Sequence, residues 1–206
     1  CFAAGTRILT ERGEIAVEAL KIGDMVVTPR AKNDDAMPIR WIGRQHYEGQ
    51  RALFEQPVLV RADAFGPGQP HRDLMVSGDH CLFIDGHLIP AKLLVNGATI
   101  VAQAGHQQID YFNVELDDHT ILLAEGLESE SYLDCGNRMR FDNCDEANEW
   151  VKTRGYRDSS VWNDGTAFAT PLWTGPVLEA IRARLAAKAA EVPGSLFTAP
   201  PLAIAS

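Results

Sequence analysis

The sequence predicts a mainly β fold over residues 1–137, followed by a helical C-terminal extension over residues 138–206. Three observations favour this division. Before residue 138, short runs rich in Val, Ile, Leu and Phe are separated by Gly, Pro, Asn and Asp. After it, apolar residues recur with helical spacing. Two stretches of the first part also resemble each other, which indicates an internal repeat.

Apolar runs in the first part have the length and composition of strands. They span residues 7–9, 25–28, 39–42, 58–60, 74–76, 81–84, 99–102 and 109–116. In the last run apolar and polar residues alternate, so that Phe112 and Val114 share one face while Asn113 and Glu115 share the other. Such alternation is typical of a strand with one buried face.

The internal repeat consists of similar residues that lie 73 or 74 positions apart. The pairs are Gly13 and Gly86, Leu20 and Leu93, Ile22 and Val95, Gly23 and Gly97, Val26 and Ile100, and Val27 and Val101. Each copy is typical of a strand, a glycine turn, a short Ala/Leu segment, a glycine turn and a strand. The pattern predicts two β arms related by a pseudo-two-fold axis. The alternative is a chance match at hydrophobic positions.

The extension contains two predicted helices. The first spans residues 143–155, with Asn143 as N-cap and Glu146 three residues later. The second spans residues 177–191, and its apolar face consists of Leu178, Ile181, Leu185 and Ala189. The proline-containing tail at 199–201 is expected to be extended.

Charge and motif content exclude several functional classes. The formal net charge is −9, and a nucleic-acid partner is not expected because phosphate binding needs a basic face. No apolar run reaches the ~18 residues of a membrane span. The sequence has neither a C-x-x-C pair nor an H-E-x-x-H motif, so we predict no metal and no cofactor. The stretch 110–134 has eight acidic residues and no Lys or Arg, which favours a solvated acidic surface over a buried strand.

Three stretches carry residues suited to chemistry. Cys1 precedes a glycine turn and a strand, where a deprotonated thiol would be a nucleophile and a protonated one a small apolar residue. Ser77 and His80 lie three residues apart in a turn between apolar runs. That turn either aims both groups at one carbonyl or is a capped turn with a surface histidine. The third stretch, 111–126, contains His119.

These stretches, in this order, resemble the Hint family of Hedgehog autoprocessing domains and inteins. Cys1-Phe2 with Gly5-Thr6 is similar to the first block of the family and residues 15–28 to its continuation. Ser77-x-x-His80 is similar to its Thr-x-x-His block, with Ser in place of Thr. Residues 119–126 resemble the final block, and residues 63–71, 72–80 and 88–97 resemble bacterial Hint proteins with a Hedgehog-type layout. The resemblance covers residues 1–137 and implies a horseshoe-like, pseudo-two-fold β fold.

The resemblance implies a single-turnover self-cleavage rather than a conventional multi-turnover enzyme. The Cys1 sulfur would attack the carbonyl of the preceding residue, moving the acyl group from nitrogen to sulfur. His80 would protonate the Cys1 nitrogen, and the Ser77 hydroxyl would bind the scissile amide or the oxyanion. The thioester would then pass to water or a small nucleophile, releasing an N-terminal passenger linked in cis. The chain, which begins with Cys rather than Met, would be the product of that cleavage.

Departures from the family pattern leave some roles open. The terminal His-Asn pair of inteins is missing and Asp134-Cys135 is a remote substitute, so splicing is not expected. The final block is one residue longer and has Asn113 where many inteins have Asp, which leaves the role of His119 open. Where Hedgehog domains have an Asp, the stretch 41–46 has no carboxylate. Either His46 acts as the base or water is the acceptor, and we favour water.

Two other functional classes remain as alternatives. An N-terminal-nucleophile cysteine amidohydrolase also begins with Cys, but it needs long helices that the first 140 residues do not predict. A catalytically inactive β-rich interaction module would leave a precursor intact. The extension, residues 138–206, would be an adduct-recognition region or a structural cap.

Overall fold

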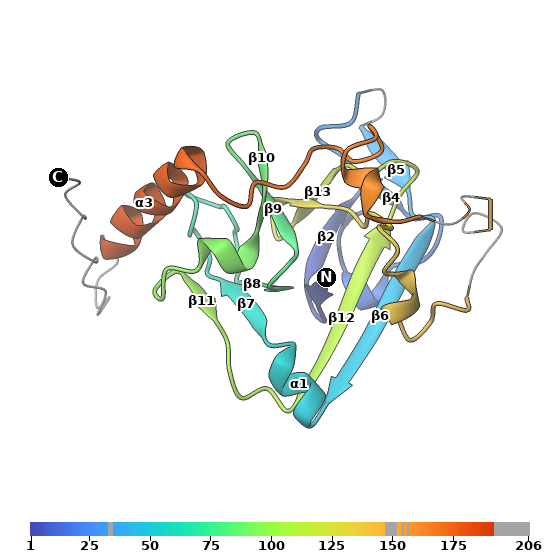
Figure 1. Ribbon diagram of the computed structural model, residues 1–206, viewed down its shortest axis with the longest axis horizontal. Helices are drawn as coiled ribbons and strands as arrows, with labels where there is room; N and C mark the ends of the chain where they lie inside the picture. The colour runs from blue at the N-terminus through green and yellow to red at the C-terminus, as the bar shows by residue number, and fades with distance from the viewer. Residues whose placement is uncertain (33–34, 147–151, 154, 156, 192–206) are drawn as a thin grey trace.

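The computed structural model describes residues 1–32, 35–146, 152–153, 155 and 157–191. Its strands form two curled antiparallel sheets (Figure 1), which confirms the predicted mainly β fold. One sheet has the order β11-β7-β8-β1-β12-β6. Its strands are β1 (Phe2–Ala3), β6 (Trp41–Glu48), β7 (Pro57–Val60), β8 (Leu74–Ser77), β11 (Ile100–Ala102) and β12 (Gln108–Glu115).

The other sheet has the order β10-β9-β14-β13-β2-β4-β5, with β3 paired to β2. Its strands are β2 (Arg7–Thr10), β3 (Gly13–Ala16), β4 (Met25–Val27), β5 (Ala36–Pro38), β9 (Cys81–Ile84), β10 (His87–Pro90), β13 (Ile121–Ala124) and β14 (Leu127–Glu130). The largest core cluster contains buried side chains from both sheets, such as Phe2 and Ile8. Burial of this apolar surface is the main force that holds the sheets together.

Among the helical segments whose bounds lie in the described residues, only α3 (Pro176–Ala190) is long. The others are η1 (Val17–Ala19), α1 (Gln50–Phe54), η2 (Ala91–Leu94), η3 (Arg138–Arg140) and η4 (Ser159–Trp162). Helix α3 lies where the sequence predicts one, begins one residue earlier because proline suits the first helical turn, and buries the four predicted apolar residues. Residues 147–151 and 154 of the helix predicted at 143–155 lie outside the described residues, as does the tail at 199–201, and the predicted helix start at 143–145 is a turn.

The internal repeat is present as a repeated order of elements. In the first arm, β2, β3, η1 and β4 follow one another, and in the second arm β9, β10, η2 and β11 do the same. A backbone hydrogen bond recurs as well, because Val17 N–H donates to Thr6 O over 2.8 Å and Ala91 N–H donates to His80 O over 2.9 Å. Both residues of this bond are offset by 74 positions. The predicted repeat is therefore present in the backbone structure of the two arms.

Strand β1 brings the start of the chain between two other strands. Phe2 pairs with Phe112 of β12 on one side and with Val76 of β8 on the other. Strands β6 and β12 lie side by side over their full length (Figure 1). Cys1 therefore lies beside the end of β8 and close to β6.

Two details of the sequence interpretation are wrong. The run predicted as one strand at 39–42 crosses from one sheet to the other: β5 ends at Pro38 and β6 begins at Trp41, while Arg40 N–H donates to Glu115 O. On β12, Asn113 and Glu115 are buried rather than solvated, because later segments of the chain cover that face. Among the described residues, no helix has the length and apolar character needed to cross a bilayer.

Candidate active site

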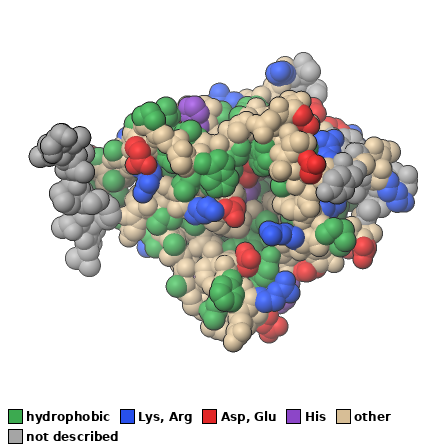
Figure 2. Space-filling model, viewed as in Figure 1, with side chains coloured by type: hydrophobic (Ala, Val, Ile, Leu, Met, Phe, Trp, Pro, Cys, Tyr) green, Lys and Arg blue, Asp and Glu red, His purple; other side chains and the backbone are tan. Residues whose placement is uncertain are grey.

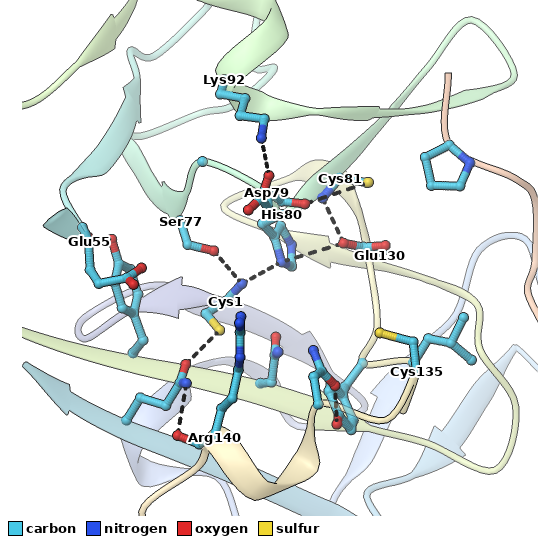
Figure 3. A pocket seen from close by; sticks show the side chains of 18 of the residues that line it. Cys1, Glu55, Ser77, Asp79, His80, Cys81, Lys92, Glu130, Cys135 and Arg140 are labelled. Atoms are coloured by element: carbon cyan, nitrogen blue, oxygen red, sulfur yellow. Dashed lines mark hydrogen bonds and ion pairs between the residues drawn. The ribbon is translucent and has the colours of Figure 1, made fainter. Parts of the chain in front are cut away.

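The amine nitrogen of Cys1 lies between a hydroxyl and an imidazole. It donates to Ser77 Oγ over 2.9 Å and lies 2.9 Å from His80 Nδ1 (Figure 3). The sequence separations are 76 and 79 residues, so only the fold brings these groups together. Three of the residues singled out in the sequence therefore meet at one nitrogen atom.

The turn that carries Ser77 and His80 is anchored by backbone hydrogen bonds. Ser77 N–H donates to Cys1 O over 2.8 Å, and His80 N–H donates to Ser77 O over 3.0 Å. Lys92 N–H donates to Gly78 O over 2.9 Å from the η2 side. The Phe2 ring packs edge-on against the His80 ring, with centroids 4.3 Å apart. These contacts fix the imidazole before any reaction takes place, as an efficient site requires.

The thiol of Cys1 has a partner that the sequence analysis missed. Its Sγ donates to Gln45 Oε1 over 3.3 Å, and Gln45 Nε2 donates to Arg140 O over 3.1 Å. Gln45 is buried on β6, whose side chains alternate between the two faces of the sheet. Gln45 can be recognised as the partner of the thiol only from the register of β6. The sequence analysis lacked this register because it placed the start of the strand wrongly.

His46, the neighbour of Gln45, points away from Cys1. Its Nδ1 lies 2.7 Å from Asp110 Oδ1, and its side chain is 43% exposed. The pair with Asp110 raises the pKa of His46 from its ordinary value. The structure does not bring His46 to the cleft that contains Cys1, which removes it as a base for an acyl acceptor there.

Burial sets the charge state of the centre. It lowers the pKa of the Cys1 amine from 8.0 to about 5, against the opposing effects of Glu130, Cys81 and Asp79. The pKa of His80 is well below its usual 6.5, first because the ring is buried and then because the amine and His119 lie nearby. Near neutral pH both groups are uncharged, and a neutral imidazole can accept a proton.

Glu130 and His119 form a second layer behind His80. Glu130 Oε1 accepts the Cys81 N–H over 2.7 Å and lies 4.0 Å from His80 Nδ1. Glu130 Oε2 lies 3.6 Å from His119 Nε2. His119 is buried and does not line the cleft.

The acidic stretch 110–134 is not the solvated surface that the sequence predicts. Glu115 is buried and pairs with Arg138 over 2.8 Å. Glu125 is also buried and pairs with Arg72 over 2.7 Å. Their cationic partners lie outside the stretch, so its local composition gives no indication of these ion pairs.

The centre opens into a cleft of about 740 Å³. Figure 2 shows this face of the molecule hollowed near its middle, with charged side chains around the hollow. Strand and turn residues of the β region form part of the wall. The rest comes from the C-terminal extension and includes Arg140, Trp162 and Trp173. The extension therefore helps to enclose the space around Cys1.

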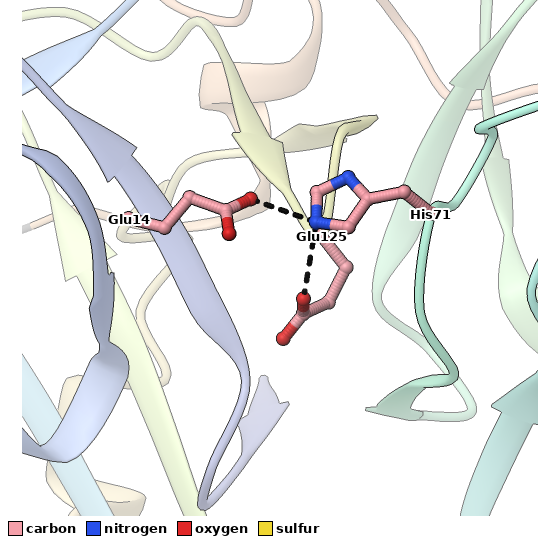
Figure 4. A group of neighbouring side chains, drawn as sticks. All are labelled: Glu14, His71 and Glu125. Atoms are coloured by element: carbon pink, nitrogen blue, oxygen red, sulfur yellow. Dashed lines mark ion pairs between the residues drawn. The ribbon is translucent and has the colours of Figure 1, made fainter.

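A second titratable cluster consists of Glu14, His71 and Glu125 (Figure 4). His71 Nε2 lies 2.9 Å from Glu14 Oε1 and 3.7 Å from Glu125 Oε2. These are ligand types that metals accept. However, Arg72 Nη2 lies 2.6 Å from Glu14 and its Nε lies 2.7 Å from Glu125, so the guanidinium already compensates both carboxylates. The cluster is an ion-pair network that joins β3 to two turns.

The chain matches one family model and is similar to several solved structures. A family model described as "Hint domain" matches residues 1–136. Among solved structures, the MchDnaB-1 intein is 13% identical with a TM-score of 0.45, covering 63% of this chain and 98% of that one. A bacterial intein-like domain from Clostridium thermocellum is 18% identical with a TM-score of 0.47, covering 64% and 97%. The Msm DnaB1 intein splicing domain, solved with zinc bound, is 15% identical with a TM-score of 0.46, covering 64% and 100%. No curated protein sequence matches the chain.

Proposed function

Because this chain belongs to the Hint domain family, we propose that it is an autoprocessing domain that forms a thioester at Cys1. In a precursor, the thioester would link the Cys1 sulfur to the carbonyl carbon of the preceding residue. Its cleavage releases the N-terminal passenger. The observation that carries the proposal is the position of the Cys1 nitrogen, 2.9 Å from both His80 Nδ1 and Ser77 Oγ.

The first step moves an acyl group from nitrogen to sulfur. The Cys1 sulfur attacks the preceding carbonyl carbon, the C–S bond forms and the C–N bond breaks. The thiol proton passes through His80 to the Cys1 nitrogen, which leaves as an amine. Neutral His80 accepts this proton, and because its pKa is low the resulting imidazolium donates readily. The balance of atoms needs no further reactant.

Ser77 and Gln45 hold the reacting atoms. Ser77 Oγ accepts from the Cys1 nitrogen, so the hydroxyl is placed to follow that nitrogen as it becomes an amine. Its backbone N–H holds Cys1 O, which fixes the main chain on the other side of the residue. Gln45 Oε1 holds the sulfur on the side of β6. Such prior positioning removes much of the entropic cost of the attack.

Water is the acyl acceptor that the cleft favours. The open space of about 740 Å³ reaches Cys1, and His46 lies elsewhere. Asp134, the remote substitute for a terminal Asn, is bound to Arg138 Nε over 2.9 Å and accepts from Gly136 N–H over 3.0 Å. Because its carboxylate is held in this way, cyclisation at that position is disfavoured. Hydrolysis, or transfer to a small nucleophile, follows instead of splicing.

The N-terminal-nucleophile hydrolase is disfavoured by architecture. That class needs layers of long helices, whereas among the described residues up to 146 the α-helical segment is α1, with five residues. An inactive interaction module would leave a precursor intact, whereas an autoprocessing domain would cleave it, and this difference can be measured.

A precursor with a short peptide before Cys1 tests the proposal. We expect cleavage directly before Cys1, accelerated by dithiothreitol, as followed by intact-protein mass spectrometry. Cys1→Ala should abolish the cleavage, and Cys1→Ser should slow the thiol-dependent step. Incorporation of labelled oxygen from water into the released carboxyl group would separate hydrolysis from transfer. A wild-type precursor that stays intact with and without thiol would contradict the proposal in favour of the inactive module.

A further inference from the structure

The C-terminal extension contacts the second layer of the site at His119. Phe168 N–H donates to His119 Nδ1 over 3.0 Å. The Trp162 ring packs edge-on against the imidazole, with centroids 5.6 Å apart and planes at 87°. Both residues lie beyond residue 136, where the family match ends. The extension therefore holds the position of a buried histidine inside the Hint domain.

The hydrogen bond from Phe168 fixes the tautomer of His119. An imidazole nitrogen that accepts a hydrogen bond carries no proton, so neutral His119 carries its proton on Nε2. That nitrogen faces Glu130 Oε2 at 3.6 Å. Among the described residues, neither atom has a partner within hydrogen-bond distance. Each is thus the natural partner of the other, because a buried donor and a buried acceptor are costly unless they pair.

The other oxygen of Glu130 faces the reacting centre. Strand β14 lies beside β9, with Ser129 opposite Leu82, and this register places Glu130 beside the turn that carries His80. Oε1 accepts the Cys81 N–H over 2.7 Å and lies 4.0 Å from His80 Nδ1. Figure 3 shows Glu130 on the far side of His80 from Ser77, with dashed lines to the His80 ring and to the Cys81 N–H.

We propose that Glu130 is a positioning residue for cleavage at Cys1, and that the extension supports it through His119. The negative charge of Glu130 stabilises the positive charge that forms on His80 and on the departing Cys1 amine. His119, oriented by Phe168 N–H, keeps the carboxylate directed at them. This inference rests on the proposed function, and Glu130 is not consumed in the step.

Charges near the amine single out Glu130. The groups that raise the pKa of the amine against burial are Glu130 first, then Cys81 and Asp79. Burial raises the pKa of the Cys81 thiol far above its usual range, so this thiol is uncharged at working pH. Asp79 is paired with Lys92, which compensates its charge. Of these three groups, Glu130 is thus the anion that has no salt bridge to Lys or Arg within the part of the chain that the structure describes.

Glu130→Gln keeps the shape and the acceptor for Cys81 N–H but removes the charge. In the precursor we expect it to slow thiol-induced cleavage about tenfold or more, because the positive charge that develops loses its counter-charge. Glu128→Gln is the matched control, since Glu128 lies two residues away on the same face of β14 but pairs with Arg30 at the surface. It should change the rate by less than about twofold.

The amine of the cleaved chain provides a readout that a purely structural role would not move. In the wild type its pKa is about 5, and NMR titration should find it lower in Glu130→Gln and unchanged in Glu128→Gln. A normal cleavage rate and a normal amine pKa in Glu130→Gln would overturn the inference. Failure of the wild-type precursor to cleave would instead overturn the proposed function, while the titration of the cleaved chain still tests the charge coupling.

The link through the extension has its own test. Nitrogen NMR of the histidine rings should find His119 protonated at Nε2 and unprotonated at Nδ1, and the opposite tautomer would refute the link. His119→Gln should slow cleavage in the wild-type background, but by less than about twofold once Glu130 is already Gln, because the two act as one unit. Equal effects in both backgrounds would show that His119 acts independently of Glu130.

Discussion

The two arms of the repeat have nearly the same backbone but different chemistry. In the first arm, Thr6 N–H donates to Ala3 O over 3.2 Å, and in the second arm His80 N–H donates to Ser77 O over 3.0 Å. These positions are again 74 residues apart. The same turn therefore carries Ala and Thr in one arm, and Ser and His in the other.

Each arm also closes its turn from the following 3-10 helix. In the first arm, Gly5 N–H donates to a Glu18 carboxylate oxygen over 2.9 Å. In the second arm, the equivalent Lys92 pairs with Asp79. The contact is made at the same place in both arms, but a hydrogen bond from a backbone N–H to a carboxylate in the first arm is replaced by an ion pair in the second. The repeat therefore supplies the same turn in both arms, and under the proposed function activity depends on which side chains that turn presents to the Cys1 nitrogen.

Exchanging the residues of the two turns gives the largest expected effect. His80→Thr introduces the first-arm residue into the second arm, and it should lower the rate of thiol-induced cleavage about 10²–10⁴-fold, the usual contribution of a general acid or base. Thr6→Val, at the equivalent place in the first arm, should change the rate only a few-fold. This corresponds to a change of about 0.5–1 kcal/mol at most in the activation free energy. The same precursor assay measures both. Comparable losses in the two variants would mean that the turns are not functionally different.

Sequence reasoning reached the parts of the site that lie in short, ordered motifs. Cys1, Ser77 and His80 lie in blocks that resemble the family, and the structure brings all three together. It missed Gln45 because one residue of strand register decides whether Gln45 or His46 faces the sulfur. In the fold, α3 was predictable because its apolar residues repeat regularly, while the crossover at 39–40 lies inside a short run in which no Gly, Asn or Asp marks a turn.

Glu130 was missed for a different reason. It lies in an acidic stretch whose composition is typical of a solvated surface, and its partners Cys81 and His119 come from other strands and loops. Only the pairing of β14 with β9 makes it an interior group. Burial of an acid depends on contacts distant in the sequence, and local composition cannot predict such contacts.

A pH effect on stability tests the burial of the amine beside the turn of the second arm. Folding lowers the pKa of the amine from 8.0 to about 5, so between these pH values the unfolded chain binds more protons than the folded one. The free energy of unfolding of the cleaved chain should therefore rise with pH over this range, by at most about 1.4 kcal/mol per pH unit from this group. Urea unfolding at several pH values measures it.

The control for this effect is an uncleaved precursor with Cys1→Ala, in which the nitrogen is an amide and does not titrate. The pKa of His80 is also lowered by folding, so it adds a dependence of the same sign in both proteins. The difference between the two slopes reports the amine together with the part of the His80 shift that the amine causes. Identical slopes would show that the amine is not buried beside His80.

The smallest expected effects concern two neighbours on β6, the strand that lies beside β12 near both arms. Gln45→Leu removes the acceptor of the Cys1 thiol and should slow cleavage about tenfold at most, since a neutral hydrogen bond contributes about 0.5–1.5 kcal/mol. His46→Gln should leave the rate within about twofold, because its side chain is on the opposite face of the sheet and pairs with Asp110. A lower cleavage rate in His46→Gln than in Gln45→Leu would mean that the acyl acceptor is activated from outside the cleft. The turn of the second arm would then act only in the formation of the thioester.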